Sequence, residues 1–425
     1  MQTACYDPKN SLQSAKILTE MSVNRVIVLL AGAALLMTAF IPPAPHTIGI
    51  GEITYAVLVT VILLWFILRL LAGPCVLQRS YFYPLLGVFA FLLVLSMWPS
   101  FVVNNVSPYL WLRGAIPFLI YAIILPLVYT VKTLTDLYIL IGSLILSALV
   151  IALNSIYSIA DAKGYWRVLL PAHTFQPHLI AAFAFLTGYA TEVKGLRKVS
   201  AWIVSFFFLV IILITESRSL IMLAAVAAVV SLLRGGRVLT KLLRLAVVAV
   251  VAVVLVTILQ RNVENVDVFR RFARGIVDPT RIEETKAVLA EFAKNPILGN
   301  GLGYQYTYER TSIRLIWEGG YTHNLVTYVL LTMGLVGVIV LLLAGVTLIQ
   351  EVLLSLRVIQ HSASQEAKAL FWGSYYALCM TLGYALFQSV FRTLGFPLIV
   401  SFCIIIMLKV RLLNYSGRGT SIREM

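Results

Sequence analysis

Residues 319–337 read GGYTHNLVTYVLLTMGLVG, a polar and aromatic opening followed at once by an apolar run. The run continues to about residue 348, and a membrane-spanning helix needs roughly 20 apolar residues. Runs of similar length recur along the chain, so helices rather than a barrel must satisfy the backbone polar groups. The sequence therefore predicts an all-α polytopic membrane protein.

Composition supports this prediction. Hydrophobic residues make up 60% of the 425 residues, charged residues make up 12%, and the mean hydropathy is +0.93. In soluble domains about a quarter of the residues are charged. Residues 1–24 are polar and no small-residue cleavage site follows the first apolar run, so no signal peptide is expected. The twelve predicted spans are 25–42, 49–71, 82–98, 109–130, 134–155, 176–191, 199–215, 218–233, 242–259, 324–348, 368–390 and 394–410.

The positions of Lys and Arg predict the orientation of these spans. The net charge is +15, but most basic residues lie at span ends on alternate sides, which favours an insertion signal over nucleic-acid binding. Basic clusters at 194–198, 234–244 and 409–423 fall on one side, predicted to be cytoplasmic together with both termini. The short outer segments hold Arg113, Lys163, Arg167, Arg218 and Arg392. The chain then divides into spans 1–9 (1–259), a large outer helical loop (260–322) and spans 10–12 (323–425).

Other patterns narrow the functional class. The four cysteines fall on the inner side or inside spans, so no disulfide framework is expected, and no CxxC or HExxH pattern predicts a metal site. Transporters often carry ionisable groups at mid-membrane. Here Glu52, Arg113, Glu216, Arg218 and Arg392 all lie near the outer ends of spans. That placement favours chemistry at the outer surface over transport.

The outer loop contains a predicted helix between Asp278-Pro279 and Asn295-Pro296. Helical spacing places Arg281 on the apolar side of this helix, toward protein or membrane. A snorkelling arginine, or one paired with Glu284, is an equally good interpretation. Residues 299–303 read GNGLG, a tight turn whose amides could hold an anion, although a plain turn is the simpler interpretation.

His323 differs from the other four histidines because it opens a span directly after the long outer segment. Histidine accepts protons near neutral pH, which makes His323 a candidate general base. The simpler interpretation is a capping or interfacial residue. Glu216 is the competing candidate base.

An arginine, a helix, a Pro-x-x-Gly-x-Gly turn at 296–301 and His323-Asn324 opening a span with Gly334 and Gly337 resemble the O-antigen ligase and polymerase family. Residues 215–219 (TESRS) are similar to the family's arginine at the outer start of a span. Residues 175–178 (FQPH) resemble its Asn-Pro-Asn step, with both asparagines replaced.

The resemblance implies a metal-independent glycosyltransferase without a cofactor. Ligases of this family join a polysaccharide carried on undecaprenyl diphosphate to the lipid A core at the periplasmic face of the bacterial inner membrane. Polymerases join two carrier-linked glycans instead. A flippase for the lipid-linked sugar is the alternative from a different class.

The chemistry of such a donor suggests roles for individual residues. Breaking the sugar–diphosphate bond leaves negative charge, which guanidinium groups can hold bidentately. Arg218 and Arg281 are the first candidates, followed by Arg113 and Arg392. Secondary candidates for binding or catalysis are Glu216, Asn324, Gly301, Gly303, Tyr304, Arg271, Arg274 and Arg314. Attack by an acceptor hydroxyl, with His323 taking the proton, would invert the anomeric centre.

Overall fold

The structure, a computed structural model, describes residues 8–41, 50–73, 82–161, 177–215, 217–234, 279–310, 315–320, 322–362 and 364–416, with Val254 and Thr257. The α-helices are α1 Pro8–Met37, α2 Ile50–Leu71, α3 Phe82–Met97, α4 Pro108–Leu119, α5 Ile124–Thr130, α6 Leu134–Asp161, α8 His178–Ala190, α9 Gly195–Ile214, α10 Arg218–Leu233, α13 Pro279–Phe292, α14 Leu325–Ser362, α15 Gln365–Ala385 and α16 Gly395–Ser416. Shorter elements are the π-helix η1 Trp98–Val103, the 3-10 helices η2 Ile120–Ile123 and η4 Ser389–Arg392, and the strands β1 Tyr306–Arg310 and β2 Leu315–Gly319.

The protein is an all-α polytopic membrane protein, which confirms the predicted fold class. Among the described residues, six helices are long and apolar enough to cross a membrane. Shorter apolar helices lie at Ser22–Met37, His178–Ala190 and Arg218–Leu233. The predicted span at 242–259 lies outside the described residues except for Val254 and Thr257, both helical. The total of twelve spans therefore stays a prediction.

The helix bounds differ from the predicted spans at several points. The first predicted span starts at 25, whereas α1 starts at Pro8, and the tenth continues past 348 to Ser362. The fourth predicted span, 109–130, divides into α4, η2 and α5. Pro117 lies inside α4 and Pro126 inside α5. Because proline has no amide hydrogen and its ring crowds the preceding turn, regular helix is interrupted there.

The core of the bundle forms around α8, of which every residue except Tyr189 is buried. Helix α15 packs most closely against it, and α6, α9, α10 and α16 also contact it. A Cβ at Gly188 would lie 2.7 Å from the Trp372 carbonyl oxygen, and one at Gly373 would lie 2.8 Å from the Phe185 ring. Small residues at these positions let the two backbones approach closely, as is usual in membrane helix pairs.

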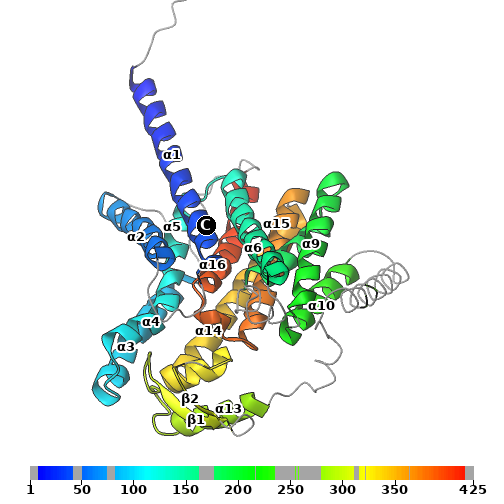
Figure 1. Ribbon diagram of the computed structural model, residues 1–425. Helices are drawn as coiled ribbons and strands as arrows, with labels where there is room; N and C mark the ends of the chain where they lie inside the picture. Colours follow the sequence, from blue (N-terminus) through cyan, green and yellow to red (C-terminus); the bar gives the residue numbers. More distant parts are fainter. Residues whose placement is uncertain are drawn as a thin grey trace, which may run out of the picture.

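Helix α13 and the β1–β2 hairpin lie together at one end of the bundle, opposite the end where α1 begins (Figure 1). Tyr306 and Tyr308 of β1 pack against Val288 of α13 and Leu331 of α14. The strands pair antiparallel, and the prediction that this outer segment is a helical loop is wrong for the hairpin. The alternation of buried Tyr306 and Tyr308 around Thr307 is a strand pattern, since successive side chains point to opposite faces.

Residues 295–303, the glycine loop, are inserted into a break in α14. The break is at Gly334, with φ 63° and ψ −155°. Two amides after the break donate to carbonyls of the glycine loop, and two amides of the loop donate to carbonyls before the break. The four bonds run from Leu335 to Pro296 (2.9 Å), from Val336 to Ile297 (3.2 Å), from Asn300 to Leu331 (2.8 Å) and from Gly301 to Thr332 (3.0 Å). The loop thus supplies the partners that a continuous helix would have provided.

The π-helix η1 holds the glycine loop from another side. Ser100 Oγ donates to the Leu302 carbonyl (3.0 Å), and Asn104 Nδ2 donates to the Asn300 carbonyl (2.8 Å). A Cβ at Gly301 would lie 2.2 Å from Ser100 Oγ, so only glycine fits there. The loop therefore fixes the outer part of α14 relative to α3 and η1.

Candidate functional site

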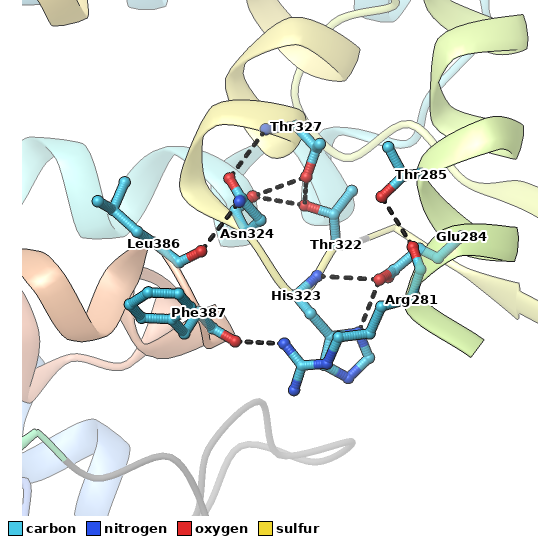
Figure 2. A network of polar contacts seen from close by, with 9 residues as sticks. All are labelled: Arg281, Glu284, Thr285, Thr322, His323, Asn324, Thr327, Leu386 and Phe387. Carbon is cyan, nitrogen blue, oxygen red and sulfur yellow. Dashed lines mark hydrogen bonds and ion pairs between the residues drawn. The ribbon is translucent and has the colours of Figure 1, made fainter. Parts of the chain in front are cut away.

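Polar side chains from α13 and from the start of α14 meet the turn that follows α15 (Figure 2). We call this group the outer junction. Its members are the side chains of Arg281, Glu284, His323 and Asn324 and the backbone carbonyls of Leu386 and Phe387.

Glu284 and His323 form the closest ionisable pair of the junction. Glu284 Oε2 lies 2.8 Å from His323 Nδ1 and accepts a longer bond (3.4 Å) from the His323 amide. The Glu284 side chain is 5% exposed and that of His323 is 21% exposed. The second carboxylate oxygen, Oε1, is buried and has no hydrogen-bond partner among the described residues. The imidazole is therefore held at Nδ1 and partly open elsewhere.

Arg281 lies on the same face of α13 as Glu284, one turn earlier. Its Nη1 donates to the carbonyl of Phe387, just beyond α15. This contact agrees with the expectation that Arg281 faces protein on the apolar side of the helix. The described ion pair of Glu284 is with His323 rather than with Arg281. The helix itself, predicted between 278 and 295, is confirmed as Pro279–Phe292.

Asn324 caps the first turn of α14 and ties it to α15. Its Oδ1 accepts from the amides of Val326 (2.7 Å) and Thr327 (3.3 Å), and its Nδ2 donates to the Leu386 carbonyl (2.9 Å). Asparagine at this position satisfies amides that the helix cannot. Asn324 therefore fixes the start of α14, directly after His323.

Arg218 opens α10 beside the same turn after α15. Ser219 accepts a hydrogen bond from Gln388 (3.3 Å), and Ser217 is hydrogen-bonded to Tyr384. Arg281 in turn is close enough to act electrostatically on Tyr384. The segment from Tyr384 to Gln388 thus brings the start of α10 and the Arg281 side of α13 to one region.

Arg392 approaches the start of α14 at Tyr328. The Arg392 guanidinium carbon lies 6.0 Å from the centre of the Tyr328 ring, one to two turns after His323. Gly114, the residue after Arg113, packs against the same tyrosine, since a Cβ there would lie 3.5 Å from the Tyr328 hydroxyl. Arg113 itself is half-buried, and no hydrogen-bond or ion-pair partner for it lies among the described residues.

The secondary candidates Gly301, Gly303 and Tyr304 have structural contacts instead. The Gly301 amide is bonded within the protein, and a Cβ at Gly303 would lie 2.6 Å from the backbone of Leu110. The amides of Gly299 and Asn300 are also bonded to carbonyls, which favours the simpler interpretation of 299–303 as a packed turn.

Tyr304 belongs to a small polar network that joins the glycine loop to α13. Its hydroxyl donates to Glu291 Oε2 (2.7 Å), which also pairs with Lys294 Nζ (2.8 Å). Burial and the bond to Glu291 raise the pKa of Tyr304 to about 12. Burial opposes ionisation of Glu291, but the hydrogen bonds from Lys294 and Tyr304 outweigh it and lower the pKa of Glu291 below 4.5.

Comparison with known protein families identifies this region. Residues 203–342, about a third of the chain, match the family model described as O-antigen ligase. This match supports the predicted resemblance to the O-antigen ligase and polymerase family. A search of curated proteins finds no match. The matched family comprises membrane glycosyltransferase-like enzymes, whose substrates are a lipid-linked glycan and an acceptor in the membrane.

The part of the chain that matches the O-antigen ligase family contains α10, α13, the glycine loop, His323 and the first half of α14. It therefore includes His323, the first-rank arginines Arg218 and Arg281, and all of the secondary candidates. Arg113 and Arg392 lie outside the match and come from α4 and η4.

Several residues considered from sequence cannot be placed. Glu216, Arg271, Arg274 and Arg314 lie outside the described residues. Within the described ranges, no group of three or more His, Cys, Asp or Glu side chains lies close enough to hold a metal ion.

Glu284 is the residue of the site that sequence analysis missed as a partner of His323. The two are 39 positions apart. The sequence held one indication that Glu284 belongs to the site. It lies three residues after Arg281 and therefore on the same face of α13.

Proposed function

We propose that the protein transfers a glycan from undecaprenyl diphosphate to a sugar hydroxyl of the lipid A core, as an O-antigen ligase. The observation that carries the proposal is the outer junction, to which Arg281 and the partly exposed His323 both belong, at the start of α14. The basic clusters at predicted inner span ends support a periplasmic junction, cytoplasmic termini and a bacterial inner-membrane location.

An apolar cavity of about 200 Å³ supports a prenyl-linked donor. It follows one stripe of α14 that includes Leu325, Val329, Met333, Leu341 and Leu348, and it is also lined by α3, α4 and α16. Between the first and last of these residues a helix rises roughly 35 Å, close to the thickness of a hydrocarbon core, about 30 Å. One end of the cavity lies two residues from His323. A prenyl chain in this cavity would therefore present its diphosphate to the outer junction.

The arginines would hold that diphosphate. Arg281 reaches the turn after α15 and Arg392 lies beside Tyr328, while Arg218 and Arg113 belong to elements that contact the same turn and the same tyrosine. Guanidinium groups stay charged and bind phosphate oxygens bidentately. Their charge stabilises the leaving group as negative charge develops on it.

His323 would accept the proton of the attacking hydroxyl. The acceptor oxygen forms a bond to the anomeric carbon while the bond from that carbon to the diphosphate oxygen breaks. The diphosphate leaves with the electron pair, and the hydroxyl proton passes to the imidazole. A single displacement of this kind inverts the anomeric centre and needs no covalent intermediate.

The test uses purified protein in nanodiscs with undecaprenyl-diphosphate-linked glycan, with and without lipid A core. We expect glycosylated lipid A core as the product and no reaction without it. Chain extension in the absence of the core would instead identify a polymerase. Movement of the lipid-linked glycan across proteoliposomes without any new glycosidic bond would overturn the enzyme assignment in favour of a flippase.

A further inference from the structure

We propose that Glu284 is a positioning residue that fixes the tautomer and orientation of His323 for proton transfer. This inference rests on the proposed function, in which His323 accepts the proton of the acceptor hydroxyl. Glu284 reaches His323 from α13 through a single carboxylate oxygen, which contacts both Nδ1 (2.8 Å) and the backbone amide (3.4 Å). The pair therefore fixes the ring relative to its own backbone.

The tautomer follows from the chemistry of the contact. An ionised carboxylate offers only acceptor oxygens, so His323 Nδ1 must carry the hydrogen of this bond. In a neutral imidazole the other nitrogen, Nε2, then has the free lone pair. The 2.8 Å contact thus leaves Nε2 as the atom that can take a proton from substrate.

The cost of burying Glu284 supports a functional role. Its side chain is 5% exposed, and its Oε1 is buried with no partner among the described residues. A buried polar atom without a partner destabilises the folded state, and an apolar residue of similar size is often neutral or stabilising in its place. Fold stability alone therefore does not account for a carboxylate at this position.

The neighbouring arginine keeps a separate contact. Arg281, one turn earlier on the same face of α13, donates to the Phe387 carbonyl rather than to Glu284. One helix face thus presents a cation and an anion with different partners. Glu284 acts on the imidazole, while the guanidinium is placed toward α15.

The first experiment compares Glu284→Leu with Glu283→Leu, the same change one residue earlier on α13. Turnover is measured with undecaprenyl-diphosphate-linked glycan and lipid A core. We expect kcat to fall about 10- to 100-fold in Glu284→Leu with an unchanged donor KM, because the general base is misplaced rather than lost. Glu283→Leu should retain wild-type kcat. A folded Glu284→Leu protein with wild-type kcat would overturn the proposal.

Glu284→Gln keeps the shape of the side chain and one acceptor oxygen. We expect it to recover part of the kcat lost in Glu284→Leu. If the leucine variant fails to fold, kcat of Glu284→Gln is compared with that of the wild type instead. In a His323→Ala background, Glu284→Leu should cause no additional loss, because it acts through the missing imidazole. An equal loss in both backgrounds would place its effect elsewhere and contradict the positioning role.

Nitrogen NMR of histidine-labelled protein gives a readout that needs no substrate. The His323 signals, identified by their loss in His323→Gln, should show hydrogen on Nδ1 in the wild type and change in Glu284→Leu only. Unchanged signals would overturn the inference while leaving the proposed function intact. Full turnover by His323→Ala would instead overturn the proposed function.

Discussion

The glycine loop and the outer junction both join the outer segment to α14, but they satisfy their polar groups in opposite ways. In the glycine loop, uncharged residues exchange backbone hydrogen bonds with α14, and the backbone takes conformations open to glycine. In the junction, ionisable side chains contact one another or single carbonyls, and His323 keeps 21% of its side-chain surface exposed. The loop uses its amides mainly within the protein, whereas the junction keeps an ionisable side chain partly exposed.

This difference separates stability from chemistry along one stretch of chain. Packed backbone hydrogen bonds fix the position of α14, and they use the amides of Gly299, Asn300 and Gly301. The junction then carries its charged groups on an element that is already fixed, as catalytic sites require. Changes in the loop should therefore affect folding, and changes in the junction should affect turnover.

The strongest test of this separation is His323→Ala. We expect glycan transfer to fall about 100- to 10,000-fold, the usual contribution of a general base, in protein that still folds, with some loss of thermal stability because buried Glu284 loses its imidazole partner. His361→Ala, at the other end of the same helix, is the matched control. Comparison with Glu216→Gln distinguishes the two candidate bases. Near wild-type turnover by His323→Ala would exclude His323 from the mechanism.

The converse test is Gly334→Ala in the break of α14. A Cβ there would lie 2.4 Å from the Ile297 carbonyl oxygen, and the backbone has φ 63° and ψ −155°. We expect a loss of about 3 kcal/mol in the free energy of unfolding, measured by thermal denaturation in detergent. Gly345→Ala on the same helix is the control, since its added Cβ meets nothing within 4 Å. Equal stability of the two variants would contradict the structural role of the loop.

Arg281→Ala asks whether the junction binds the donor as well as positioning the base. Affinity for a short-chain prenyl diphosphate should fall about 10- to 100-fold, because a hydrogen bond to a charged group contributes about 1.5–3 kcal/mol. Arg281→Lys should recover part of the lost affinity, since lysine keeps the charge but loses the bidentate geometry. Lys286→Ala, an exposed cation on the same helix, should bind normally. Unchanged affinity in Arg281→Ala would exclude it from diphosphate binding, and Arg218→Ala would be tested next.

Gly345→Leu extends the comparison to the apolar cavity. Gly345 lines the cavity at a point where an added Cβ meets nothing, so a larger side chain would occupy space assigned to the prenyl tail. Filling it should raise KM for the undecaprenyl donor roughly tenfold, because overpacking costs about 1–3 kcal/mol. A donor with a prenyl tail too short to reach it should be unaffected. Gly142→Leu, at an exposed position on α6, is the control, and an equal effect there would reject the tail site.

The smallest effect is expected from the network of Tyr304, Glu291 and Lys294. Since the pKa of Glu291 is lowered in the folded state, its stabilisation is present above 4.5 and is lost as pH falls through the folded pKa. Since the pKa of Tyr304 is raised from 10.0 to about 12, its contribution is present below 10.0 and is lost as pH rises through about 12. Tyr304→Phe should lower the unfolding midpoint at neutral pH by roughly 1–2 °C, whereas Tyr109→Phe, at an exposed position, should not. A pH-independent difference would show that packing rather than charge is responsible.

Local patterns predicted the elements of the site better than their contacts. Asp278-Pro279 and Asn295-Pro296 predicted α13 because helix starts and stops depend on adjacent residues. His323 was singled out by its place at the start of a span. Its pairing with Glu284 depends on how α13 packs on α14, which periodicity within either helix does not determine.

The break at Gly334 shows the same limit. The residue was noted as part of a family pattern, and the hydropathy of its surroundings predicted an uninterrupted span. Hydropathy measures side chains, whereas the break concerns backbone partners supplied by residues 296–301, more than thirty positions earlier. The glycine turn in the outer loop gave no indication that its backbone hydrogen bonds would be made to residues in the middle of α14.

The backbone hydrogen bonds between the glycine loop and the break in α14 have a consequence for how the protein is assembled. The carbonyls of Leu331 and Thr332 receive their donors from a segment that is synthesised before this helix and that, in the proposed orientation, must first cross the membrane. The helix would then complete its backbone bonding only when that segment docks. In that orientation, correct placement of His323 would depend on export of the preceding chain, and a molecule inserted the other way round would leave the backbone of α14 without these partners.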